Sequence, residues 1–241
     1  MLLDNILKVG NKLELSERYA VDGRVETKNY QSQIADIIDD ENIEALMPVY
    51  EGRLIPLEKG SEFDAYISSG GILYNCKVLV TNRYKNGNIY LVCLRILTDI
   101  KKYQRREYYR FDIGTDFAFK PISNMESMVI SKIGDEPESV ATRPQLRAVT
   151  IDISGGGLKY VTTNRNAKGE IILVFFDIPT NTGLKKLKLQ GRVLQSTMSM
   201  NRPGVYEERL EFFDVRRDDR DSIVKYIFEM ERKRRQKQRG Q

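Results

Sequence analysis

The chain has 241 residues, of which 41% are hydrophobic and 30% are charged, and it contains no histidine and no tryptophan. This composition is typical of a globular protein and argues against a disordered or fibrous chain, and the length suits one large domain or two small ones. Without histidine, Ser/His/Asp and Cys/His nucleophiles, histidine metal sites and the commonest general base are excluded, so an enzyme is disfavoured although paired carboxylates or a lysine remain.

The net charge of +5 comes from the C-terminal end of the chain. Residues 232–241 carry six cations and no anion, and removing these six charges leaves −1 for the remaining residues. A nucleic-acid-binding surface normally spreads cations over one face of a domain. The basic pI therefore gives little support to such a surface, and the tail fits a solvated helix end better than a lipid contact.

Two observations bear on compartment and metal binding. Cys76 and Cys93 each lie inside an apolar run, which favours small buried thiols over a disulfide or metal ligands. Asp4 and Asn5 interrupt the apolar stretch that a signal peptide needs, and no run approaches the ~20 residues of a membrane span. We therefore expect a cytoplasmic protein with no transmembrane segment and no metal.

The first hundred residues alternate short apolar runs with turn signals, which predicts consecutive β-strands. Asn86 and Gly87 predict a tight hairpin because both residues tolerate a positive φ. These strands fit a small antiparallel barrel or sandwich in a domain of residues 1–98. The predicted strands are residues 12–16, 30–38, 43–50, 62–69, 72–80 and 88–97.

A charged connection over residues 99–110 predicts a linker, and a second domain of residues 111–241 follows it. Residues 123–145 are polar and contain glycine and proline, which predicts a long surface loop inside this domain. The other segments again predict strands. These are residues 111–122, 147–154, 157–163, 170–178, 184–198 and 204–215.

One C-terminal helix is expected, because apolar residues recur there at i, i+3, i+4 and i+7. Asp218 and Asp219 stand at its start and the cations at its end, which complements the helix dipole. The predicted fold class is mainly β, with two small antiparallel β-barrels in tandem and a C-terminal α-helix. The apolar stripe consists of Ile223, Tyr226, Ile227 and Met230.

An arginine cluster in the predicted linker indicates an anionic ligand. Arg106 and Arg110 form an RxxxR pattern that Arg105 precedes. Guanidinium groups gathered in this way need an anion to offset their charge, and their planar fork suits phosphate and the O6 and N7 edge of guanine. Interleaved tyrosines could cover a base or face the core. They are Tyr103, Tyr108 and Tyr109.

A second pattern, DISGGG, follows in the second domain. Asp152 can accept hydrogen bonds from the N1 and N2 donors of guanine, and Ser154 can donate or accept. The glycines Gly155, Gly156 and Gly157 permit close approach of the backbone. A simple hairpin turn or bulge would explain the glycines equally well if they stood alone.

The segments QRREYYR and DISGGGLKY together resemble the paired signature of the PilZ domain, a β-barrel receptor for cyclic di-GMP. The resemblance extends from Tyr103 to the C-terminal helix and includes the GRV segment at Gly191. The preceding domain is similar in architecture to the N-terminal barrel of flagellar brake proteins. Residues 123–145 depart from the family, because they are longer than a minimal PilZ domain needs.

The resemblance implies roles for individual residues. Arg106 and Arg110 would bind phosphate and guanine, and Arg105 would accompany the binding of two stacked ligand molecules, because a basic residue at this position tends to do so in the family. The resemblance implies no catalytic residues and no metal ligands. The residues expected to line the base are Asp152, Ser154, Gly156 and Gly157.

The function expected from the resemblance is that of a cyclic di-GMP receptor, not an enzyme, which changes its interdomain arrangement and regulates motility through flagellar stator or switch proteins. This leaves open an association with the flagellar basal body. Related receptors control exopolysaccharide production or secretion, which remains an alternative output linked to biofilm. A nucleic-acid-binding protein is the alternative of another class, but no specific nucleic acid partner is expected.

Overall fold

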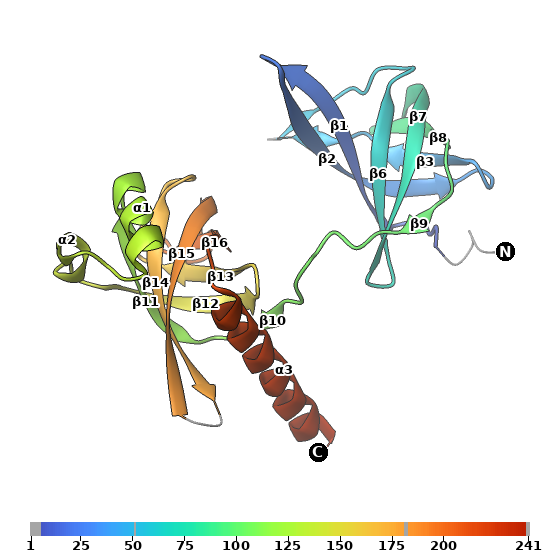
Figure 1. Ribbon diagram of the computed structural model, residues 1–241. Coiled ribbons are helices and arrows are strands. Elements are labelled where there is room, and N and C mark those ends of the chain that lie inside the picture. The colour runs from blue at the N-terminus through green and yellow to red at the C-terminus, as the bar shows by residue number, and fades with distance from the viewer. Residues whose placement is uncertain (1–5, 51, 181–182, 240–241) are drawn as a thin grey trace. The chain divides into compact units, whose positions relative to one another are not determined.

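A computed structural model describes residues 6–50, 52–180 and 183–239. The chain forms two compact units, Met1–Arg105 and Arg106–Gln241, and each is described by itself. Each unit is built around one antiparallel sheet that closes on itself (Figure 1). The predicted fold class, mainly β with two barrels and a C-terminal helix, is confirmed. Whether residues 99–110 act as a linker stays a prediction.

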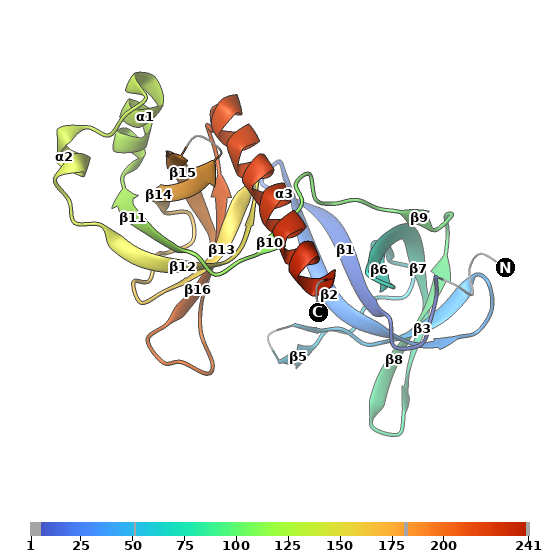
Figure 2. The same cartoon turned by 90° about the horizontal axis from the view of Figure 1, so that it is seen from below.

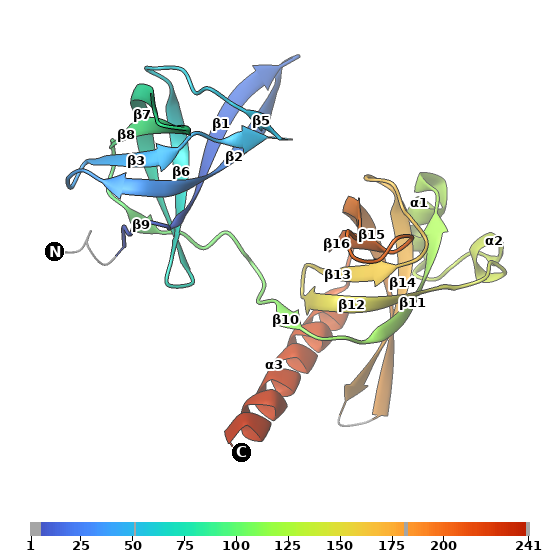
Figure 3. The same ribbon diagram turned by 180° about the vertical axis from the view of Figure 1, so that it is seen from behind.

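The N-terminal unit is a ring of strands in the order β6-β1-β2-β3-β8-β7, which β6 closes by pairing with β7 (Figure 3). Alternate side chains of these strands point inward, and the core includes Leu13, Leu15 and Ile67 with no exposed area. The strands are β1 Lys12–Val21, β2 Arg24–Ile37, β3 Asn42–Leu46, β4 Val49–Tyr50, β5 Arg53–Leu54, β6 Glu62–Ser69, β7 Ile72–Asn86, β8 Ile89–Ile96 and β9 Lys101–Lys102.

The C-terminal unit is a second ring, in the order β12-β11-β14-β15-β16-β13, which closes because β12 also pairs with β13. The short strand β10 pairs with Asp152 and Ile153 of β12, beyond the stretch of β12 that pairs with β11. Phe119, Tyr160 and Phe176 fill the barrel and are almost completely buried. The strands are β10 Phe111–Asp112, β11 Asp116–Ile122, β12 Leu146–Ser154, β13 Gly157–Thr162, β14 Ile171–Thr180, β15 Gly183–Met198 and β16 Tyr206–Phe212.

Helix α3, Arg217–Arg239, packs its predicted apolar stripe on this barrel. Ile223, Tyr226 and Ile227 are buried, and Met230 packs against the same core, so the stripe is confirmed. Figure 2 shows α3 running beside β10. The side chains of residues 232–238 are exposed.

The predicted surface loop of residues 123–145 is wrong, because it contains helices α1 Asn124–Ile133 and α2 Glu138–Ala141. Ser123 and Glu126 form a reciprocal capping box at the start of α1, and Gly134 ends it in the left-handed conformation. The buried ammonium of Lys120 donates to the carbonyl oxygens of Val140 and Ala141 at the end of α2. A strand residue therefore holds the helical insertion against the barrel.

Several predicted strands differ from the structure at their ends. The run of residues 111–122 divides into β10 and β11, and the run of 43–50 divides into β3 and β4. Strands β1 and β2 extend to a tight turn at Asp22 and Gly23, both of which have positive φ. The predicted hairpin at Asn86 and Gly87 is confirmed, because β7 and β8 meet there.

The two cysteines carry free thiols. Cys76 is buried, and this burial raises the pKa of its thiol to about 12. Cys93 is only partly buried and lies 3.8 Å from a carboxylate oxygen of Glu44. None of the helices within the described residues combines the length and apolar character that crossing a membrane would require.

Candidate functional site

The DISGGG segment forms the connection between β12 and β13. Ser154 pairs with Gly157 at the ends of the two strands, so Gly155 and Gly156 make a two-residue turn. The register of the hairpin shifts between Thr150 and Asp152, which is a β-bulge. Because a bulge changes the direction of the side chains that follow it, this irregularity sets how Asp152 is presented.

Gly157 cannot carry a side chain, because β16 passes too close to it. A Cβ atom at this position would lie 2.0 Å from the carbonyl oxygen of Leu210. The neighbouring hydroxyl of Ser154 is buried and donates to the carbonyl oxygen of Gly157 over 3.1 Å. The turn is therefore fixed by the close approach of β16 and by the hydrogen bond from the Ser154 side chain.

A row of charged residues crosses the barrel at Asp152. Asp112 of β10 lies directly opposite Asp152 on one side, and Lys159 of β13 lies opposite it on the other. Lys159 in turn faces Arg209 of β16. Side chains at directly opposed positions of antiparallel strands share one face of the sheet. The strand register therefore gathers two anionic and two cationic residues on one surface.

The pKa of Asp152 is raised, chiefly because the carboxyl group is partly buried. The nearby charge of Arg110 acts in the opposite direction and favours the carboxylate, as do Lys159 and Arg209, whereas Asp112 adds to the increase. A partly desolvated carboxylate surrounded by cations is well suited to accept hydrogen bonds from a ligand that also carries negative charge.

The arginine segment is attached to the C-terminal barrel by its aromatic residues. The ring of Tyr108 lies on the glycine turn, and the guanidinium of Arg220 in α3 donates to its hydroxyl group. Phe111 is buried in the barrel core, and Arg234 of α3 lies over its ring with its guanidinium carbon 5.8 Å from the ring centre. Arg110 therefore lies between two anchored positions.

The preceding residues are held on the N-terminal barrel. The ring of Tyr103 packs against that of Tyr66 in a tilted arrangement with ring centres 5.1 Å apart, and the backbone N–H of Tyr103 donates to the carbonyl of Leu73. The exposed guanidinium of Arg105 lies 3.4 Å from the carboxylate of Glu14. Arg105 is thus the last residue of one unit and Arg106 is the first residue of the next.

The structure brings together some of the predicted site residues. Arg110 and Asp152 interact electrostatically, and Ser154, Gly156 and Gly157 follow Asp152 in the turn. Arg106 is exposed and precedes Tyr108 by two residues, whereas Arg105 pairs with Glu14 in the other unit. The sequence prediction missed three neighbours of the site. They are Lys159, Arg209 and Arg220.

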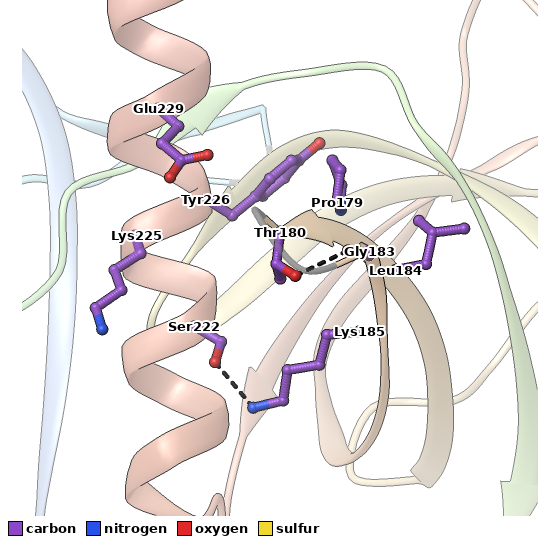
Figure 4. Close-up of a pocket in the computed structure, with 9 residues that line it drawn as sticks. All are labelled: Pro179, Thr180, Gly183, Leu184, Lys185, Ser222, Lys225, Tyr226 and Glu229. Atoms are coloured by element: carbon purple, nitrogen blue, oxygen red, sulfur yellow. Dashed lines mark hydrogen bonds between the residues drawn. The ribbon is translucent and has the colours of Figure 1, made fainter.

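Elsewhere on the C-terminal unit, a pocket lies between the β14–β15 hairpin and α3 (Figure 4). Lys185 donates to the hydroxyl of Ser222 across it, and Tyr226 lines its inner side. No predicted site residue lines this pocket. Among the described residues there is also no group of three or more cysteine, aspartate and glutamate side chains arranged to hold a metal ion.

Each unit matches the model of a known protein family. Residues 104–229 match the family model described as "PilZ domain", and residues 8–96 match the one described as "Flagellar protein YcgR". The fold is similar to that of the Bacillus subtilis inhibitor of motility MotI/DgrA, with a TM-score of 0.70 and 17% identity over 95% of this chain and 100% of that one. It is also similar to Escherichia coli YcgR, solved in complex with c-di-GMP, with a TM-score of 0.54 and 14% identity over 99% of this chain and 92% of that one. No curated protein matches significantly.

Replacing Asp152 by asparagine is expected to raise the melting temperature at pH 7. Because the pKa of Asp152 is raised above its ordinary value of 3.8, its ionisation costs folding free energy at neutral pH, and an amide avoids this cost. The gain should shrink as the pH falls through the raised folded pKa toward the ordinary value of 3.8, and it is lost below that value, where wild-type Asp152 is protonated in both states. Thermal unfolding of Asp152→Asn and wild type between pH 4 and 8 measures this difference in melting temperature and its dependence on pH.

The matched control is Asp116→Asn, which changes an exposed aspartate at the start of β11. Its effect on the free energy of unfolding should stay within about 0.5 kcal/mol at every pH. A lower melting temperature for Asp152→Asn at pH 7 would contradict the electrostatic description of this site.

Proposed function

This chain is a member of the PilZ family, and we propose that it is a cyclic di-GMP receptor and not an enzyme. The family's domain is a receptor domain for this ligand and is generally non-enzymatic. The observation that carries the proposal is that Arg110 directly precedes β10, whose Asp112 lies opposite Asp152 of β12, so the charge of Arg110 acts on a partly buried carboxyl beside the glycine turn. Together these groups offer a phosphate-binding cation and an acceptor for the N1 and N2 donors of guanine.

In the proposed complex, Arg106 and Arg110 bind phosphate and the guanine O6 and N7 edge, and Asp152 binds the opposite edge of the base. Lys159 and Arg209 add positive charge beside Asp152, which favours a dianionic ligand. Residues of the turn support this arrangement by fixing the backbone from which Asp152 projects. They are Ser154, Gly156 and Gly157.

We further propose that two stacked ligand molecules bind, with Arg105 contributing to the second. For this the guanidinium of Arg105 must exchange its contact with Glu14 for a contact with ligand. An exposed pair at 3.4 Å is worth about 1 kcal/mol or less, so a phosphate can replace the carboxylate readily. Ligand binding would then release the arginine segment from one unit and bind it to the other.

This exchange is the basis of a proposed switch. The segment is attached to the N-terminal barrel through Tyr103 and to the C-terminal barrel through Tyr108, so residues 104–107 lie between two attached ends. A ligand that binds Arg105 and Arg106 orders this connection and changes the relative arrangement of the units. Both similar proteins, MotI and YcgR, carry names that refer to motility or the flagellum. We propose that the switch acts on a stator or switch protein of the motor, in the cytoplasm at the flagellar basal body.

Calorimetric titration with cyclic di-GMP tests the site. Wild type should bind two molecules per chain, and Arg110→Ala and Asp152→Asn should each weaken binding by about 10- to 100-fold, because each loses a charged hydrogen bond of about 1.5–3 kcal/mol. Arg105→Ala should reduce the stoichiometry to one. Arg202→Ala, which removes an exposed arginine of the β15–β16 connection, is the control with unchanged binding. Full binding by both Arg110→Ala and Asp152→Asn would refute the site.

Small-angle scattering tests the switch. Wild type should change its scattering profile at a cyclic di-GMP concentration that just saturates it, whereas Arg110→Ala at the same concentration should change much less, because its weakened affinity leaves most of the sites empty. Superimposable wild-type profiles with and without ligand, under conditions where calorimetry reports saturation, would rule out the proposed rearrangement.

The output is tested by swimming in soft agar. Expression of wild type in flagellated cells with a high level of cyclic di-GMP should reduce the swimming diameter, and Arg110→Ala at equal abundance should leave it unchanged. Normal swimming with wild type, together with altered exopolysaccharide production, would overturn the motor proposal and favour the secretion alternative.

A further inference from the structure

Tyr108 is the aromatic residue in closest contact with the glycine turn. A Cβ atom on Gly155 would lie 2.6 Å from Cδ1 of Tyr108, and one on Gly156 would lie 3.0 Å from Cδ2. The two sides of the ring therefore rest on two consecutive glycines. Any side chain at Gly155 would displace the ring, because real Cβ contacts are essentially never this short. The ring of Tyr108 can therefore occupy this position only because Gly155 and Gly156 have no side chains.

Helix α3 holds the same ring from a different side. The guanidinium of Arg220 donates to the Tyr108 hydroxyl, and its central carbon lies 5.3 Å from the ring centre. Val224, one turn further along α3, also contacts the turn, with its Cγ2 3.1 Å from the Cβ position of Gly155. Tyr108 thus makes a backbone contact, a hydrogen bond and a cation–π contact, all within the C-terminal unit.

We propose that Tyr108 and Arg220 form a clamp that positions Arg106 and Arg110 for the ligand, and that the glycines seat this tyrosine instead of the guanine base. The inference rests on the proposed function and adds Arg220 as a positioning residue. Its place on α3 couples the C-terminal helix to the ligand site, because movement of α3 moves the clamp.

The physical reason is the entropy of the arginine segment. Arg106 and Arg110 are exposed and lie two residues to either side of Tyr108, in a segment that has no helix or strand of its own before β10. Fixing such a backbone on binding costs affinity, and a segment fixed in advance avoids that cost. The buried side chain of Phe111, the first residue of β10, fixes the chain directly after Arg110. The ring of Tyr108 fixes the chain midway between Arg106 and Arg110.

The first test measures cyclic di-GMP affinity. Tyr108→Ala and Arg220→Met should each weaken binding by about tenfold, whereas Tyr108→Phe, which keeps the ring on the glycines and loses only the hydroxyl, should recover most of the affinity. Two matched controls should bind like wild type. Tyr206→Ala removes another partly buried tyrosine with a stacked arginine, Arg165, and Arg217→Met removes an exposed arginine of α3.

Wild-type or tighter binding by Tyr108→Ala would overturn the clamp. Tighter binding would mean that the ring instead excludes the base from the glycines. Recovery of binding in Tyr108→Phe shows that the ring, and not the hydroxyl, positions the arginines. Unchanged melting temperatures of Tyr108→Ala and Arg220→Met show that the lost affinity does not come from a general loss of structure.

A second measurement needs no ligand and separates failure of the clamp from failure of the proposed function. Hydrogen exchange of the free, full-length protein should be faster at the amides of residues 107–112 in Tyr108→Ala and Arg220→Met than in wild type and Arg217→Met. Unchanged exchange would refute the clamp. If wild type does not bind cyclic di-GMP but exchange responds as expected, the clamp stands and the proposed ligand is wrong.

Discussion

The close approach of β16 to Gly157 is the constraint on which the site depends. The Leu210 carbonyl occupies the space that any Cβ at this position would need, so the pairing of β13 with β16 requires a glycine at the end of the turn. Together with the pairing of β12 and β13, this pairing aligns three strands and places Lys159 and Arg209 in one row with Asp152. The strand pairings that form this part of the barrel therefore also align its charged row.

A buried polar network stabilises the same pair of strands further along their pairing, where Tyr160 lies opposite Glu208. Glu208 of β16 has no exposed area and accepts hydrogen bonds from Tyr160, Asn166 and Ser196. A buried carboxylate is tolerated when its oxygens are satisfied in this way, and removing a donor leaves an expensive uncompensated group. The strands that carry the charged row are thus held in register both by close backbone packing and by an ionic hydrogen-bond network.

Helix α3 contributes more to the site than its apolar stripe alone indicates. Ile223 and Ile227 bury the helix on the barrel, while Arg220 and Arg234 reach the aromatic residues on either side of Arg110. The helix therefore both completes the core and contacts the segment that links the two units.

Local sequence was sufficient for much of the fold. The alternation of apolar residues identified most strands, and the stripe from Ile223 to Met230 identified α3, because both patterns depend on residues close together in the chain. The arginine and glycine patterns identified the family for the same reason. Helix α1 also had a local signal, the capping box of Ser123 and Glu126, but the polar composition around it favoured a loop.

Only the tertiary structure decided what surrounds Asp152. Arg209 follows Asp152 by 57 positions in the chain, and it enters the row through the register of β13 against β16, which no local pattern specifies. The sequence also left open whether Tyr108 faces a base or the protein. The glycine turn and Arg220 decide this, because they come from distant segments that meet only when the barrel has closed and α3 has packed on it.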